Sequence, residues 1–75
     1  MKIFLIERTD KVNCDEYNGH VVQARDENRA YAVIETVDIG AYGSTACVKE
    51  NTTCTIVGTG KGREEKVILS SYNAG

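Results

Sequence analysis

The stretch that decides the fold is Lys2–Arg8, KIFLIER, near the start of the chain. It is short and rich in β-branched and aromatic residues. Ile3 and Leu5 fall on one alternating face, and Phe4 and Ile6 fall on the other. A strand that is apolar on both faces is typical of the middle of a sheet that is covered, at least in part, on each side. We therefore expect a central strand here, with the rest of the chain built around it.

A helix is expected after a second strand at residues 20–24, HVVQA. Asp26 is a suitable N-cap, and Glu27 places a carboxylate in the first turn, where the helix dipole favours it. Gly40 is the expected terminator. One apolar stripe with helical spacing follows the cap: Ala30, Val33, Ile34 and Val37. A helix this short is not stable alone in water, so we expect it to pack on the sheet.

The remaining segments divide into loops and short strands. Residues 9–19 (TDKVNCDEYNG) are polar and contain an Asn-Gly pair, which predicts a loop. Further strands are expected at 45–49 and 53–57 around a turn, and at 66–72 after a flexible hairpin tip, 58–65 (GTGKGREE). The predicted order is β-β-α-β-β-β. This is a single α+β domain over residues 1–75, with one helix on one face of a mostly antiparallel sheet of three to five strands.

Size and charge exclude several function classes. Seventy-five residues form one small domain. Its net charge of −2 has the wrong sign for a basic nucleic-acid-binding protein and is too small for a protein that mimics the negative charge of nucleic acid. So small a core leaves little room for an enclosed catalytic pocket, so we expect a binding protein and no enzyme.

The apolar start of the chain is too short for a signal peptide or a membrane span. The chain has three cysteines, and an odd number of them fits a reducing compartment.

The cysteines and the single histidine are the obvious candidates for a metal site. Cys14, His20, Cys47 and Cys54 are four soft ligands, but their spacings are too long for a zinc knuckle. We expect scattered, reduced thiols, no metal and no cofactor, with His20 at the surface where its strand starts. A Cys47–Cys54 disulfide between neighbouring predicted strands stays open as an alternative.

Three other patterns resemble catalytic motifs. Residues 58–62 (GTGKG) look like a phosphate loop, but no helix follows them, so we interpret them as a hairpin tip from which Lys61 and Arg63 contact a partner. A cysteine nucleophile would need an oxyanion hole and an orienting third group, and the sequence marks neither. Paired acids such as Asp15-Glu16 are expected to be solvated.

The clearest candidate interface combines acids with one aromatic residue. Asp10, Asp15 and Glu16 lie close together in the sequence, next to Tyr17. Such a surface suits a basic groove on a protein partner, with tyrosine as the anchor and the acids steering association. The expected partner-binding residues are therefore Asp10, Asp15, Glu16, Tyr17, Lys61 and Arg63.

Two blocks resemble a group of small bacteriophage accessory proteins. The segment ERTDKVNCDEY, followed by VVQA and an acid-rich helix, is similar to that group's opening pattern, and the ending VILSSYNAG is similar to its S-(F/Y)-N-A-G terminus. The resemblance implies a small α+β fold and a phage origin. Short, slightly acidic α+β domains without catalytic motifs also resemble anti-CRISPR proteins.

These resemblances imply an inhibitor of a host defence complex that acts by stoichiometric protein binding in the host cytoplasm, most concretely an anti-CRISPR protein. The implied partner is a host protein or ribonucleoprotein, such as a CRISPR surveillance complex, with no direct contact to nucleic acid or membrane. The chain itself would be a monomer or weak homodimer. The alternative is a non-inhibitory structural or regulatory phage protein that binds another phage protein.

Overall fold

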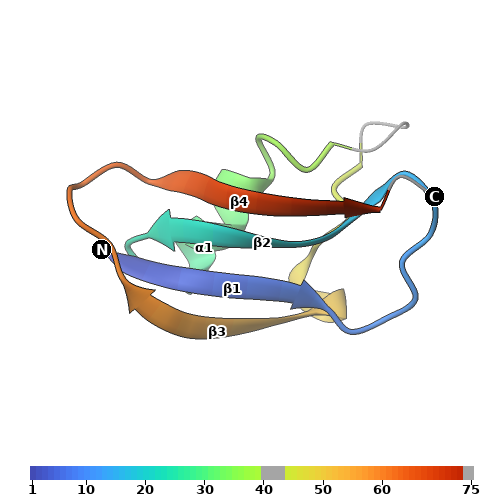
Figure 1. Cartoon of the computed structure of the whole chain (residues 1–75), viewed down its shortest axis with the longest axis horizontal. Helices are drawn as coiled ribbons and strands as arrows, with labels where there is room; N and C mark the ends of the chain where they lie inside the picture. The colour runs from blue at the N-terminus through green and yellow to red at the C-terminus, as the bar shows by residue number, and fades with distance from the viewer. Residues whose placement is uncertain (40–43, 74–75) are drawn as a thin grey trace.

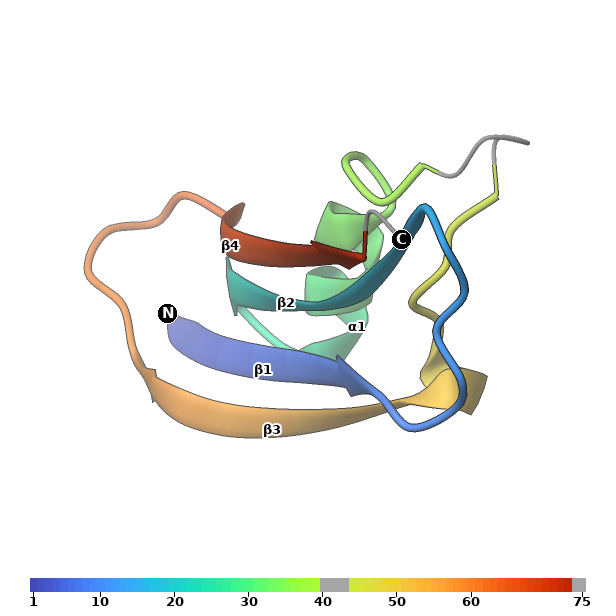
Figure 2. The ribbon, with the colours of Figure 1, turned by 45° about the vertical axis from the view of Figure 1, so that its right-hand side comes forward.

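The computed structural model describes residues 1–39 and 44–73. A four-stranded antiparallel sheet has the order β3-β1-β2-β4, and one helix lies on one of its faces (Figures 1 and 2). This confirms the α+β prediction. In chain order the elements are β1 (Lys2–Arg8), β2 (Glu16–Ala24), α1 (Glu27–Ile34), a 3₁₀ turn (Lys49–Asn51), β3 (Thr52–Thr59) and β4 (Lys66–Asn73).

Strand β1 is central, as its two apolar faces predict. It pairs with β2 on one side and with β3 on the other. Phe4 and Ile6 are buried on the face toward α1, while Ile3 and Leu5, on the opposite face, are only half-buried. Figures 1 and 2 show no helix over that second face in the described part of the chain. The sheet is therefore covered on one side and largely open on the other.

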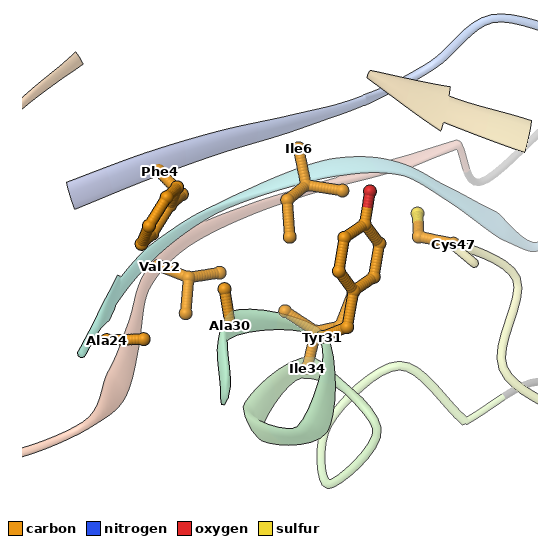
Figure 3. Packing of buried hydrophobic residues seen from close by; sticks show 8 residues of the cluster. All are labelled: Phe4, Ile6, Val22, Ala24, Ala30, Tyr31, Ile34 and Cys47. Carbon is orange, nitrogen blue, oxygen red and sulfur yellow. The ribbon is translucent and has the colours of Figure 1, made fainter. Parts of the chain in front are cut away.

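The core lies between α1 and the sheet, and α1 packs chiefly against β2. Figure 3 shows these side chains converging from both layers. The buried apolar residues are Phe4, Ile6, Val22, Ala24, Ala30, Tyr31, Ile34 and Cys47. Tyr31 was not among the predicted stripe residues. It is buried because its ring fills the space beside Ile34, and its hydroxyl lies 2.6 Å from Thr52 Oγ1.

The predicted N-cap is confirmed, but the helix ends early. Asp26 Oδ1 accepts a hydrogen bond of 2.9 Å from the backbone N–H of Arg29. After Ile34 the backbone tightens into i→i+3 bonds, among them Val37 N–H to the Ile34 carbonyl at 3.1 Å. The tighter winding rotates Val37 away from the stripe, so it is 42% exposed and the prediction that it is a core residue is wrong. Gly40, the predicted terminator, lies outside the described residues.

Two strand predictions need correction. Strand β2 begins at Glu16 because residues predicted as a loop pair with both neighbours, for example Gly19 with Glu7 of β1. A Cβ on Gly19 would lie 2.4 Å from the Ile6 carbonyl oxygen, so only glycine permits this close pairing of β1 and β2. Residues 45–49 form no strand. Their backbone groups form hydrogen bonds with side chains instead of with a neighbouring strand. For example, Asn51 Oδ1 accepts a hydrogen bond of 2.9 Å from the Val48 N–H.

The predicted hairpin at residues 58–65 is also wrong, because β3 and β4 are opposite edges of the sheet. The connection between them crosses the end of the sheet at which β1 starts (Figure 1). Gln23 on β2 holds it, since Nε2 donates to the Lys61 carbonyl at 3.2 Å and the Glu64 carbonyl at 2.9 Å. Lys61 and Arg63 therefore lie on a connection that Gln23 holds by hydrogen bonds, and both are exposed there.

No helix in residues 1–39 and 44–73 combines the length and the apolar character needed to cross a lipid bilayer.

Candidate functional site

The predicted acidic residues gather at the end of the sheet where β1 stops. Asp10, Asp15 and Glu16 all line an open groove of about 660 Å³, together with Arg8 and Lys11. Arg8 Nε lies 2.6 Å from Asp10 Oδ1, and this hydrogen bond lowers the pKa of Asp10. Arg8 Nη2 lies 3.8 Å from Glu16 Oε1. The groove therefore carries both charges, and Arg8 partly compensates the negative charge of Asp10 and Glu16.

The other predicted contact residues lie elsewhere. Tyr17 belongs to β2 and not to a loop, and its ring lies 4.9 Å from the His20 ring and 4.9 Å from the Tyr72 ring. It is part of a packed aromatic row and not a freely displayed anchor. Lys61 and Arg63 lie at the other end of β1, beside the N-terminus. The structure thus brings Asp10, Asp15 and Glu16 together and separates them from Lys61 and Arg63.

The open sheet face carries a row of apolar side chains that sequence reasoning missed. Leu5, Val21 and Leu69 are cross-strand neighbours on β1, β2 and β4. Leu69 is 65% exposed. These three residues line a hollow of about 230 Å³, with Gly19 and Glu7 at one end. The alternation in β1 was the available signal, because it placed Leu5 on the face opposite the core.

The most deeply buried polar group is centred on His20. Its Nε2 lies 2.9 Å from Asp38 Oδ2, and its Nδ1 lies 2.7 Å from Ser70 Oγ. Both the His20 and the Asp38 side chains are 0% exposed. The prediction of a surface histidine is wrong, because the longer β2 places His20 opposite Ile6, on the face toward the core.

The hydrogen bonds around Asp38 assign its charge and the histidine tautomer. Burial alone would raise the pKa of Asp38, but hydrogen bonds from His20 and from the backbone N–H groups of Ala46 and Cys47 outweigh it and hold that pKa below its ordinary value. An ionised carboxylate only accepts, so Nε2 carries the ring proton. In the neutral ring Nδ1 accepts from the Ser70 hydroxyl, 2.7 Å away.

Cys47 completes this group. Its thiol is buried, lies 3.7 Å from the Tyr17 carbonyl oxygen, and has its pKa raised to about 12 by burial and by the neighbouring Asp38 carboxylate. Within the described residues, His20, Asp38 and Cys47 place one ligand atom each so that all three lie within 4.8 Å of one another. We call these three residues the buried triad.

The buried triad differs from the set of metal ligands weighed from the sequence. Cys14 lies at the acidic groove, and Cys54 lies on β3, where burial and then Glu27 raise the pKa of its thiol to about 11. Cys47 and Cys54 are free thiols, so the alternative of a disulfide between them is not realised. Asp38 was missed because nothing in the local sequence links it to His20.

Ser70, His20 and Asp38 also follow the order of groups by which hydrolases activate a hydroxyl. Such chemistry needs a substrate cleft and oxyanion donors beside the hydroxyl. Ser70 lines neither of the two hollows described above, although His20 lines the hollow on the open face. The hydrogen-bonded chain Ser70–His20–Asp38 ties β4, β2 and the segment after α1 together.

Comparison of the chain with protein-family models, with curated proteins and with solved structures found no match.

Proposed function

We propose that this chain is a protein-binding domain that acts by occupying its partner stoichiometrically through the open sheet face. The observation that carries the proposal is the row of Leu5, Val21 and Leu69 around an apolar hollow, on a face over which no helix of residues 1–39 and 44–73 lies. Large exposed apolar groups on a small domain mark interaction surfaces, because leaving them in water costs free energy that a partner recovers.

The size of the hollow favours a protein partner over a small-molecule ligand. Pockets for drug-sized ligands hold about 300–1,000 Å³ and enclose most of the ligand. The hollow holds about 230 Å³, which suits one inserted side chain. Flat apolar surfaces with one such recess are typical of the central part of a protein interface.

Charge indicates the chemistry of the partner. Glu7 stands at the edge of the hollow, and Asp10, Asp15 and Glu16 lie around the same end of the sheet. Acids at the rim attract basic residues and raise the rate of association. The partner surface that fits is therefore an exposed apolar side chain flanked by lysine or arginine.

The resemblance of the two terminal blocks to small phage proteins supports a more specific version. In that version the chain is phage-encoded, works in the host cytoplasm and inhibits a host defence complex, most concretely as an anti-CRISPR protein. The alternative is a structural or regulatory phage protein whose partner is another phage protein. Both versions use the same open face, so one pair of variants tests them together.

The test compares the wild-type chain with Leu69→Asp and with a matched control, Ile56→Asp. Ile56 is also an exposed edge-strand residue, 56% accessible, but it pairs with Phe4 and so lies on the other face. Each chain is expressed in bacteria with and without CRISPR immunity against a challenge phage, and plaques are counted. We expect the wild type and the control to raise the plaque count in immune hosts and to leave it unchanged in hosts without immunity. The rise that Leu69→Asp produces should be at least about tenfold smaller.

Capture from infected cells separates the two versions. Retention of a CRISPR subunit by the wild type and by Ile56→Asp, with loss by Leu69→Asp, supports the inhibitor. Retention of a phage protein alone, with no effect on plaquing, supports the alternative. If all three chains retain the same proteins equally, the open face is not the interface and the proposal fails.

A further inference from the structure

We propose that the buried triad of His20, Asp38 and Cys47 is a binding site for a divalent transition metal, with Zn²⁺ as the ion that fits its donors. The proposal is independent of the open-face interface. Imidazole nitrogen, carboxylate oxygen and thiolate sulfur are the three ligand types that proteins offer to zinc. A mixed set that includes a thiolate favours zinc over the hard cations Mg²⁺ and Ca²⁺, which prefer oxygen ligands alone.

The geometry is close to what a tetrahedral ion needs. Zinc–ligand bonds of about 2.0–2.3 Å at tetrahedral angles place neighbouring ligand atoms about 3.4–3.6 Å apart. Nε2 of His20 and Oδ2 of Asp38, now 2.9 Å apart, would open by about half an ångström to reach that separation. The remaining separations are within 4.8 Å and would close by at most about 1.3 Å. Side-chain rotations of this size need no rearrangement of the strands.

The charges also balance. Asp38 is a buried anion that accepts hydrogen bonds from His20 and from the N–H groups of Ala46 and Cys47. Bound Zn²⁺ would displace the thiol proton of Cys47, and two anionic ligands with one neutral imidazole would then neutralise the ion completely. A neutral buried site costs far less desolvation free energy than an isolated buried charge. Binding would therefore release one proton per ion, from Cys47.

The surroundings supply the supporting contacts that metal ligands need. When Nε2 binds the metal, the ring proton moves to Nδ1, which then donates to Ser70 Oγ, 2.7 Å away. The N–H of Ala46 continues to hold Asp38 Oδ1 at 3.0 Å. These contacts orient two of the three ligands from outside the triad.

The Tyr17 carbonyl oxygen is placed to be the fourth ligand. It lies 3.7 Å from Cys47 Sγ, about the edge of a tetrahedral zinc site. It also accepts a hydrogen bond from Arg8 Nη1 at 3.3 Å.

Cobalt provides a direct test, because a thiolate bound to Co²⁺ gives a charge-transfer band in the near ultraviolet. The protein is treated with a chelator and a reductant, freed of both, and titrated with CoCl₂. We expect the band to saturate at one equivalent and to disappear when ZnCl₂ is added. At a hundredfold excess of free Zn²⁺ over its dissociation constant, the melting temperature should rise by at least about 10 °C.

Three cysteine variants assign the band to its ligand. Cys47→Ser, a nearly isosteric change, should abolish the band and the stabilisation by zinc, while Cys14→Ser and Cys54→Ser should retain both. Circular dichroism checks that each variant is folded. The proposal is overturned if the folded wild type gives neither band nor stabilisation. It is also overturned if the signal persists in Cys47→Ser or is lost only in Cys14→Ser or Cys54→Ser.

Discussion

The imidazole Nε2 of His20 lies 2.9 Å from Asp38 Oδ2, and both side chains are completely buried. This contact joins the middle of β2 to the segment that follows α1. A buried ion or polar group without its partner costs several kcal/mol, so the pair strongly favours the one chain arrangement that satisfies both groups. For a domain of this size we expect a stability of about a few kcal/mol, so loss of this contact would remove a large part of it.

Replacing Asp38 with asparagine should destabilise the protein by about 2–4 kcal/mol. The amide has one accepting oxygen where the carboxylate has two, so at least one of the donors from His20, Ala46 and Cys47 is left unsatisfied. Urea unfolding at pH 7 measures the loss. Asp10→Asn, which alters an exposed acid, is the control and should change the free energy of unfolding far less than Asp38→Asn does. Equal effects of the two changes would contradict the assigned network.

Stability should also fall in acid through Asp38. Its pKa in the folded protein is below the ordinary value of 3.8. The stabilisation is therefore complete above about pH 4 and is lost as the pH falls through the lower, folded-state pKa. Thermal melts from pH 7 down to pH 2 should show a steeper decline for the wild type than for Asp38→Asn. Parallel curves for the two proteins would show that other carboxylates cause the acid sensitivity.

Ile34→Asp should prevent folding, because it places an unpaired carboxylate in a core position that is 0% exposed. The expected cost is several kcal/mol, comparable to the whole stability of the domain. Val37→Asp is a matched change three residues later, at a position that is 42% exposed. It should fold and melt nearly as the wild type does. Circular dichroism melts of both variants check the helix face.

The crossing between β3 and β4 depends on the lack of a side chain at Gly60. A Cβ at this position would lie 1.8 Å from Gln23 Oε1, so Gly60→Ala must displace Gln23 and break its bonds to the Lys61 and Glu64 carbonyls. We expect a loss of about 1–3 kcal/mol in the free energy of unfolding.

Gly58→Ala is the control for that change. Its Cβ would meet Ile3 Cδ1 at 3.9 Å, an ordinary contact. If Gly60→Ala is as stable as Gly58→Ala in urea, the crossing is not pinned by Gln23.

The thiol of Cys47 should be unreactive in the native, metal-free protein. It is 1% exposed and its pKa is raised to about 12, so almost no thiolate is present at pH 8. A thiol reagent should label exposed Cys14 quickly and Cys47 only as the protein opens, with three thiols found after unfolding. Reductant should not change the melting temperature. A two-thiol deficit restored by reductant would contradict the free Cys47 and Cys54.

The sequence by itself determined the elements that depend on neighbouring residues. The apolar residues on both faces of Lys2–Arg8 predicted a central strand, and Asp26 predicted the start of α1, because both signals lie in consecutive side chains. The cover expected over both faces of that strand is present on one face only. The fold class followed from the same local signals. Ala30 and Ile34 were predicted core residues for the same reason, since four residues bring them to one face of a helix.

The tertiary structure alone decided which segments meet. Strands pair through their backbones, so the side chains of a strand say little about which strand it pairs with. The sequence therefore predicted β3 and β4 as neighbours, whereas β3 pairs with β1 and β4 pairs with β2. The pairing of β4 with β2 also places Leu69 beside Val21 on the open face and Ser70 beside the buried His20. Asp38 lies 18 residues from His20, and only the packing of α1 on the sheet brings their side chains together. Contacts of that kind depend on the whole chain, because their free energy is gained only when every intervening element is in place.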